Sequence, residues 1–187
     1  MRAKATGFSM LEILIALVIS LVTLMGAAGL VVRTVQQEVE AVQRLQALTL
    51  AQDMVDRINI NRQVVSCYSS GANGMSVGKG IAQGNLPACS SGNASQNSRA
   101  DTDIDDWHNL LLGSAEQTSG NDNIGAMIDA RGCITQVNAA DQTYRVTVVW
   151  QGMSETVAPA SSCGQNQYST EKARRAVSLL VRIGDLT

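Results

Sequence analysis

The stretch Phe8-Ser-Met-Leu-Glu-Ile-Leu-Ile-Ala-Leu-Val-Ile-Ser-Leu-Val-Thr-Leu-Met-Gly-Ala-Ala-Gly-Leu-Val-Val32 decides the fold. It is almost entirely apolar, and it is long enough to cross a bilayer as a helix, which takes about 20 residues. Arg2 and Lys4 precede it without a balancing acid, a charge distribution that keeps the N-terminus on the cytoplasmic side. The stretch therefore predicts one membrane-spanning helix followed by a domain on the far side of the membrane.

Glu12 interrupts the apolar stretch. A carboxylate at the centre of a membrane helix costs about 2.5–3.5 kcal/mol on insertion scales, and less near the helix start, where Glu12 lies. The next basic residue is Arg33, too far along the helix to reach it. A partner for the carboxylate must therefore come from another molecule, or from a new N-terminal amine made by cleavage of the chain.

Gly7, Phe8 and Glu12, followed by an unbroken apolar helix, resemble the leader of the type IV pilin family. The resemblance implies that a prepilin peptidase cuts between Gly7 and Phe8 and methylates the new N-terminus at Phe8. It also implies that Glu12 pairs with an N-terminal amine during filament assembly. The alternatives are a plain membrane anchor and a secretory signal peptide with Gly26-Ala27-Ala28 as its cleavage site. Glu12 and the length of the apolar stretch argue against the signal peptide.

Residues 33–62 continue the helix without proline or glycine, but they are polar. Helical spacing places Val35, Val39 and Val42 on one face, and a rotated face carries Ala47, Ala51, Met54, Val55 and Ile58. We expect the C-terminal half to pack on a globular head and the N-terminal half to serve neighbouring subunits. A single amphipathic helix lying on its own head throughout is the alternative. A solvated face is expected for the charged residues Glu38, Glu40, Arg44, Asp53, Asp56 and Arg57.

The four cysteines stand far apart and form no Cys-x-x-Cys pair, which argues against a zinc ribbon or a thioredoxin-like site. In an exported chain an even number of cysteines indicates two disulfides. Three pairings are possible. We favour Cys67–Cys89 and Cys133–Cys163, because each bond then closes a local excursion rich in glycine, serine and asparagine. Residues 66–100 have loop composition, and the first bond would tether them.

The acidic run Asp101-Thr-Asp-Ile-Asp-Asp106 lacks the glycine at the sixth position and the glutamate at the twelfth that a calcium loop requires. No metal site is therefore expected. A short helix is predicted instead, capped by Thr102 or Asp103 and ending near Gly113. Its buried stripe is Ile104, Trp107, Leu110 and Leu111, and His108 is expected to be exposed or half-buried.

Alternating apolar and polar residues predict β-strands in the last third of the chain. Half-buried strands are expected at 144–151 and 176–183, and strand-like pieces around a turn at Ala130-Arg-Gly132 within 125–137. A disulfide-bounded region at this place resembles that of many pilins. The predicted fold is α+β, the type IV pilin fold, in which a long N-terminal helix packs on an antiparallel sheet. The expected parts are a leader (1–7), a transmembrane helix (8–32), an amphipathic helix (33–62) and a head (63–187).

The residues capable of chemistry are scattered, so no enzyme is predicted and no cofactor is expected. There is one histidine, and the sequence shows no Ser–His–Asp spacing and no glycine-rich phosphate loop after a strand. The net charge is −2, and the one tight basic cluster, Lys172, Arg174 and Arg175, is explained as strand-edge charge. Nucleic-acid binding is therefore not expected.

Trp-His-Asn-Leu-Leu, Arg-Gly-Cys-Ile and Tyr-Arg-Val-Thr-Val-Val-Trp-Gln-Gly resemble the PilV-type minor pilins. The resemblance implies a minor pilin that enters or primes a type IV pilus and supports its biogenesis, adhesion or twitching motility. The implied partners are other minor pilins, the major pilin, the peptidase, the inner membrane and a tip adhesin. Before assembly the chain would sit in the inner membrane with a periplasmic head, and afterwards on the cell surface. The alternatives are a minor pseudopilin of a type II secretion system, or a head that itself binds a surface ligand or DNA.

Overall fold

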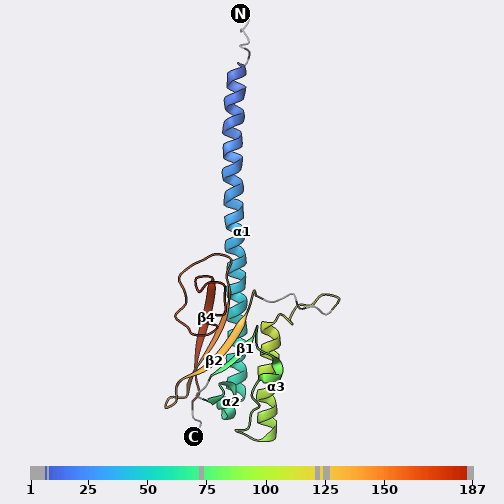
Figure 1. Cartoon of the computed structure of the whole chain (residues 1–187), viewed down its shortest axis with the longest axis vertical. Coiled ribbons are helices and arrows are strands. Elements are labelled where there is room, and N and C mark those ends of the chain that lie inside the picture. Colours follow the sequence, from blue (N-terminus) through green and yellow to red (C-terminus); the bar gives the residue numbers. More distant parts are fainter. Residues whose placement is uncertain (1–6, 8, 72–73, 121–122, 124–126, 185–187) are drawn as a thin grey trace, which may run out of the picture. The chain divides into compact units, whose positions relative to one another are not determined.

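A computed structural model describes residues 7, 9–71, 74–120, 123 and 127–184. The chain divides into two compact units, residues 1–41 and residues 42–187, and the second is called the head below. The helical elements, shown in Figure 1, are α1 (Met10–Ile60), the 3₁₀ turn η1 (Arg62–Val64), α2 (Val65–Tyr68), the 3₁₀ turn η3 (Gln83–Asn85) and α3 (Ala94–Leu111). The strands are β1 (Met75–Gly78), β2 (Arg131–Asn138), β3 (Thr143–Gln151) and β4 (Arg174–Arg182). The predicted α+β class is confirmed.

The C-terminal part of α1 belongs to the head and contributes a single buried face. Four side chains are fully buried, at the three- and four-residue spacing that places them on one side of a helix: Ala47, Ala51, Met54 and Ile58. They join a core that also contains the apolar residues of α3 and of the sheet. The two small alanines let the helix lie close to this core.

The four strands form one antiparallel sheet in the order β1-β2-β3-β4. The strand predicted at 144–151 is present as β3, but it is not half-buried. Tyr144, Val146 and Val148 face the main core, whereas Val149 lies on the opposite face in a second small core. That core contains Cys133, Cys163, Tyr168 and Ala176, because the loop after β3 folds back over this face. The prediction of one solvated face was therefore wrong.

The turn predicted at Ala130-Arg-Gly132 is absent, since Arg131 and Gly132 lie within β2. The chain turns earlier, at Asp129, whose φ is +51°. Gly132 is required by packing: a Cβ there would lie 2.3 Å from Cη2 of Trp107. The indole of Trp107 thus rests on the backbone of β2, and its Nε1 donates to the carbonyl of Leu50 on α1 at 2.9 Å.

Helix α3 starts eight residues before the predicted cap at Thr102. Asn93 is the cap: its side chain accepts the N–H of Gln96, and the Gln96 side chain accepts the N–H of Asn93. This reciprocal capping box satisfies two N–H groups that a helix start leaves free. Residues 66–100 are therefore more ordered than their loop composition predicted, since they also contain α2 and β1.

A buried polar cluster joins α1, α2 and α3 in the head. Asp103, 6% exposed, accepts the hydroxyl of Tyr68 at 2.6 Å and a guanidinium N–H of Arg57 at 3.1 Å. Arg57 also bonds Asp53 at 2.8 Å and Asp106 at 3.3 Å, so it does not lie on a solvated face as predicted. Burial, and then the hydrogen bond to Asp103, raise the pKa of the Tyr68 phenol. The cluster fixes three helices to one another.

Replacing Asp103 by alanine should lower the free energy of unfolding by about 2 kcal/mol, because the buried Tyr68 hydroxyl then has no acceptor. Chemical unfolding of the full chain in detergent measures this loss. Asp106→Ala is the matched control: it removes an ion pair with the same guanidinium, but its side chain is 54% exposed. Its expected cost is under about 0.5 kcal/mol. Equal losses in the two variants would contradict the role assigned to the buried acid.

His108 is only 2% exposed, so the prediction of an exposed or half-buried ring was wrong. Its Nδ1 accepts the backbone N–H of Gly78, the last residue of β1, at 3.1 Å. A protonated ring could not accept this bond. Burial lowers the pKa of His108, and the charge of Asp105 opposes part of that effect. The ring therefore has to be neutral in the folded head.

Because the pKa of His108 is lower in the folded state, the unfolded chain takes up this proton first as the pH falls. The stabilisation is complete above the unfolded pKa of about 6.5 and is lost as the pH drops below it. We expect the urea midpoint of the full chain in detergent to fall between pH 7 and pH 5. His108→Asn, which retains a neutral acceptor, should show a smaller fall. Identical pH dependence in both proteins would rule this account out.

Candidate functional site

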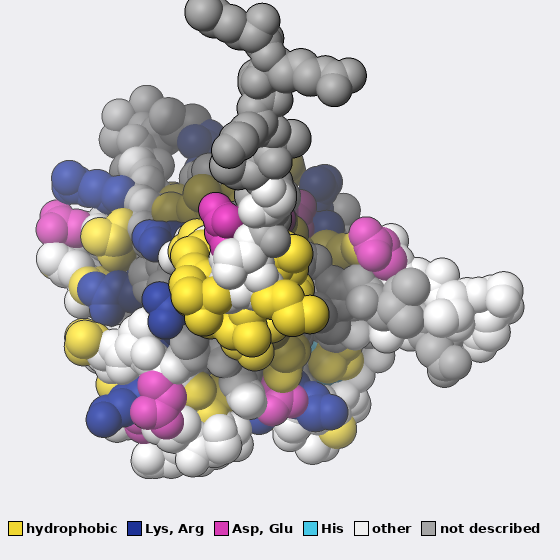
Figure 2. All heavy atoms as spheres, turned by 90° about the horizontal axis from the view of Figure 1, so that it is seen from above, with side chains coloured by type: hydrophobic (Ala, Val, Ile, Leu, Met, Phe, Trp, Pro, Cys, Tyr) yellow, Lys and Arg dark blue, Asp and Glu magenta, His cyan; other side chains and the backbone are white. Residues whose placement is uncertain are grey.

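The N-terminal part of α1 is apolar on every side. Each large apolar side chain from Leu11 to Val32 is at least half exposed, and Figure 2, seen from above, shows apolar side chains gathered around the helix. The most apolar window of α1 has a mean hydropathy of 2.6, and in the described part of the chain α1 alone is long and apolar enough to cross a membrane. A helix that is apolar all round needs an apolar environment that the chain itself does not supply.

The hydroxyls within this segment are bonded to its own backbone. Ser20 donates to the carbonyl of Ala16 at 2.8 Å, and Thr34 donates to that of Leu30 at 3.0 Å. Thr23 donates to the carbonyls of Ile19 and Ser20. Such bonds to the preceding turn let Ser and Thr lie in hydrocarbon without an unsatisfied donor.

Glu12 differs, because none of the described residues pairs with its carboxylate. It lies in the first turn of α1, where its backbone N–H donates to the carbonyl of Ser9 at 3.0 Å. The positive end of the helix dipole favours an acid at this position. Gly7 is exposed just before the helix. Phe8 lies outside the described residues, so the structure does not report on the predicted methylation site.

A shallow hollow lies beside Glu12 on the surface of α1. Glu12, Ala16 and Ser20 line it at four-residue intervals, with Ile13 and Leu17 on its flanks. Small side chains on a helix face allow another helix to approach closely. The carboxylate therefore stands at the edge of a surface that fits a neighbouring apolar segment.

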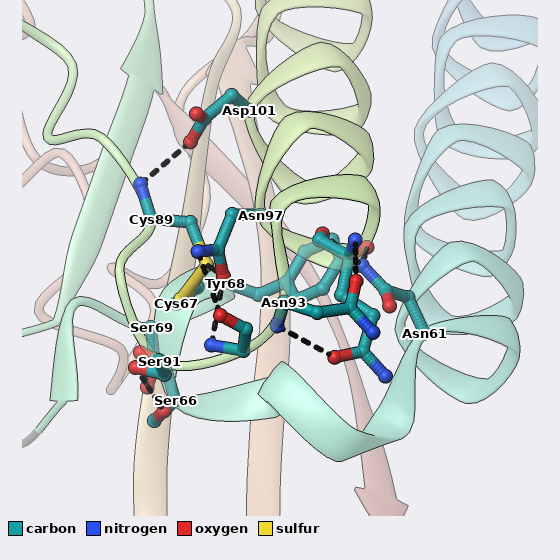
Figure 3. Close-up of a disulfide and its surroundings, with 12 residues drawn as sticks. Asn61, Ser66, Cys67, Tyr68, Ser69, Cys89, Ser91, Asn93, Asn97 and Asp101 are labelled. Atoms are coloured by element: carbon teal, nitrogen blue, oxygen red, sulfur yellow. Dashed lines mark hydrogen bonds between the residues drawn. A yellow bond between two sulfur atoms is a disulfide. The ribbon is translucent and has the colours of Figure 1, made fainter.

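Both disulfides of the favoured pairing are present. Cys67 and Cys89 are joined, with their Cα atoms 5.1 Å apart, as are Cys133 and Cys163, with their Cα atoms 5.8 Å apart. In Figure 3 the first bond links α2 to the segment before α3, and the N–H of Cys89 donates to Asp101 of α3 at 2.7 Å. The second bond ties the loop after β3 to β2.

The basic cluster near β4 includes one structural residue. Arg174 is 2% exposed, and its guanidinium donates to the carbonyls of Pro159, Ser161 and Cys163 and to Glu171. Its charge is therefore used to hold the loop that carries Cys163. This arrangement leaves Arg174 unable to contact a nucleic-acid phosphate.

In the described part of the chain, no group of three His, Cys, Asp or Glu side chains is arranged to hold a metal ion. The acidic run at 101–106 lies in α3, where Asp101 and Asp103 accept the hydrogen bonds already described.

Residues 29–105 match a family model described as Tt1218-like, type IV pilin Tt1218. Over these residues the chain is similar to the type IV pilin family. The match covers less than half of the chain and runs from the apolar part of α1 into α3, including the Cys67–Cys89 loop. No curated protein and no solved structure matches the chain. The long apolar helix, the antiparallel sheet and the two disulfides fit the pilin fold.

The matched model describes a type IV pilin, and α1 fits a single-pass membrane anchor. The family match does not reach Gly7 or Glu12. The roles of these residues therefore remain predictions from the N-terminal sequence and from the exposed carboxylate.

Proposed function

We propose that this protein is a type IV pilin, a minor subunit that enters or primes a type IV pilus together with other minor pilins and the major pilin. The observation that carries the proposal is an exposed apolar helix whose first turn carries Glu12, a carboxylate with which none of the described residues pairs. A helix of this kind can lie in a membrane while the subunit is a monomer, and it can then move into the apolar interior of a helical filament.

The chemistry starts with cleavage between Gly7 and Phe8 and methylation of the new amine at Phe8. The amine and the Glu12 carboxylate are both costly in lipid as isolated charges. Pairing the amine of an incoming subunit with Glu12 of its neighbour removes both costs at once. The small residues Ala16 and Ser20 would allow the neighbouring segment to come close.

A pilus is favoured over a secretion system by the head. The excursion closed by Cys67–Cys89 adds α2 and β1 to it. The sequence likeness to PilV-type minor pilins supports the same choice. In this proposal the pilin lies in the inner membrane with its head in the periplasm before assembly, and on the pilus afterwards. Its partners are the peptidase, the other pilins and a tip adhesin.

Deleting the gene in its own bacterium separates the two kinds of filament. Surface pili and twitching should fall by about tenfold or more, while the set of secreted proteins stays unchanged, and re-expression should restore the pili. Normal piliation with loss of secreted proteins would overturn the proposal in favour of a type II secretion pseudopilin.

A further inference from the structure

A hollow of about 280 Å³ opens beside β1, on the face of the sheet that carries the Cys133–Cys163 bond. Two cationic side chains, Lys79 and Arg131, line it together with polar groups of Ser76, Ser162, Gln165 and Gln167. None of the described carboxylates lines the hollow. Among the described residues neither cation forms an ion pair. We call this hollow the Lys79–Arg131 pocket.

The first wall is the turn that carries Lys79. Its N–H donates to the carbonyl of Ala130 at 2.9 Å, and the N–H of Ile81 donates to the carbonyl of Gly78 at 3.1 Å. Gly78 has a φ of +95°, and a Cβ there would lie 2.6 Å from the carbonyl oxygen of Ala130. The backbone that presents Lys79 is therefore fixed against the start of β2, while its side chain is exposed.

Contacts with the ring of Tyr168 and with the carbonyl of Asp129 hold the guanidinium of Arg131 in place. Its guanidinium lies over the ring of Tyr168, 5.0 Å from the centroid, and one N–H donates to the carbonyl of Asp129 at 3.2 Å. The Tyr168 hydroxyl donates to the same carbonyl at 2.9 Å. A guanidinium has five N–H donors in a fixed plane, which is more than these contacts use.

The last wall is the loop held by the Cys133–Cys163 bond. Gly164 follows the second cysteine with a φ of +62°, and a Cβ there would lie 2.9 Å from Cγ2 of Val149. The loop can therefore lie close against the sheet, and it brings Ser162 and Gln165 to the rim.

We propose that the Lys79–Arg131 pocket binds an oxyanion, that is, a sulfate, phosphate or carboxylate group on a molecule outside the chain. Lys79 and Arg131 carry like charges and repel each other, and no described acid in the hollow offsets this repulsion. A bound anion would attract both cations and so offset it. The guanidinium plane suits the two oxygens of such a group, and Lys79 adds a flexible charge. The pocket belongs to the head, so this proposal does not depend on the role of the pilin in a filament.

The full chain in nanodiscs of phosphatidylcholine allows a direct test by calorimetric titration at low ionic strength. The probes are inorganic sulfate, inorganic phosphate, glucuronate and N-acetylglucosamine 6-sulfate; a parallel sample contains phosphatidylglycerol in the nanodisc. We expect saturable binding that weakens as sodium chloride is added. Binding of the sugars alone identifies an acidic glycan, binding of the inorganic ions a free anion, and competition by phosphatidylglycerol a lipid headgroup.

Lys79→Gln and Arg131→Gln should each weaken binding by about tenfold, since each removes a charge-assisted contact. Arg131→Lys, which keeps the charge, should bind better than Arg131→Gln. Lys172→Gln is the control, because it removes an exposed lysine outside the pocket. The exposed position of Lys79 keeps its variant informative if Arg131→Gln fails to fold. Absence of saturable binding by every probe, or equal binding by Lys79→Gln and the control, would overturn the proposal.

Discussion

Replacing Glu12 by glutamine is expected to lower the amount of this protein recovered in sheared filaments by roughly a hundredfold, because a buried charge loses its partner. Glu12 is an exposed acid in an apolar helix, and none of the described residues pairs with it. Glutamine fits the same space but cannot neutralise an N-terminal amine. The amount of subunit in the membrane should not change, since the uncharged amide is easier to insert than the acid.

Immunoblots of the sheared and membrane fractions measure both quantities in a strain that otherwise makes pili. Glu38→Gln is the matched control, because it removes an exposed acid from the polar part of the same helix. We expect its incorporation to equal that of the wild type. Equal incorporation of the Glu12 variant and the control would show that Glu12 is not the acid that guides assembly.

Replacing both Cys67 and Cys89 by serine should lower the free energy of unfolding of the head by about 3 kcal/mol. The bond closes a loop with a sequence separation of 22, and without it the unfolded chain gains conformational freedom. Cys67 also lies in the main core, and Cys89 packs against that core. Amide hydrogen exchange should increase most in the N-terminal half of α3. The side chain of Asp101 there accepts the backbone N–H of Cys89, and this bond depends on the position of the segment that carries Cys89.

Urea unfolding of the full chain in detergent, followed by tryptophan fluorescence, measures the loss. Ser66→Ala is the control: it removes an exposed hydrogen bond between Ser66 and Ser91, beside the same loop. Its expected cost is under about 0.5 kcal/mol. A double cysteine variant as stable as this control would mean that the loop is held by its hydrogen bonds alone.

The sequence predicts the N-terminal helix from its unbroken apolar run, and it predicts the place of β3, but not the burial of both its faces, from alternating apolar and polar residues. It misplaces the start of α3, since the serines and asparagines of the capping segment have the composition of a loop. The signal that could have placed it is Asn93 followed three residues later by Gln96. Gly132 was misread as a turn because its role, contact with the ring of Trp107, depends on tertiary packing.

The two candidate sites, Glu12 and the Lys79–Arg131 pocket, also differ in how far the sequence predicts them. The isolation of Glu12 follows from the sequence, because no cation lies within reach along the helix. The Lys79–Arg131 pocket does not, because Lys79, Arg131 and Ser162 are distant in the chain. They meet only through the pairing of β1 with β2 and the Cys133–Cys163 bond. Arg174 holds the same loop from inside, and burial of an arginine at that place has no sequence signal.

Mass spectrometry of the mature N-terminus tests most directly whether this protein is processed for transfer from a membrane to a filament. The chain is expressed with and without a prepilin peptidase. We predict a chain that begins with methylated Phe8 only when the peptidase is present. A chain that stays uncut in both cases, or one cut after Ala28 in both, would contradict the account and indicate a plain anchor or a secreted domain.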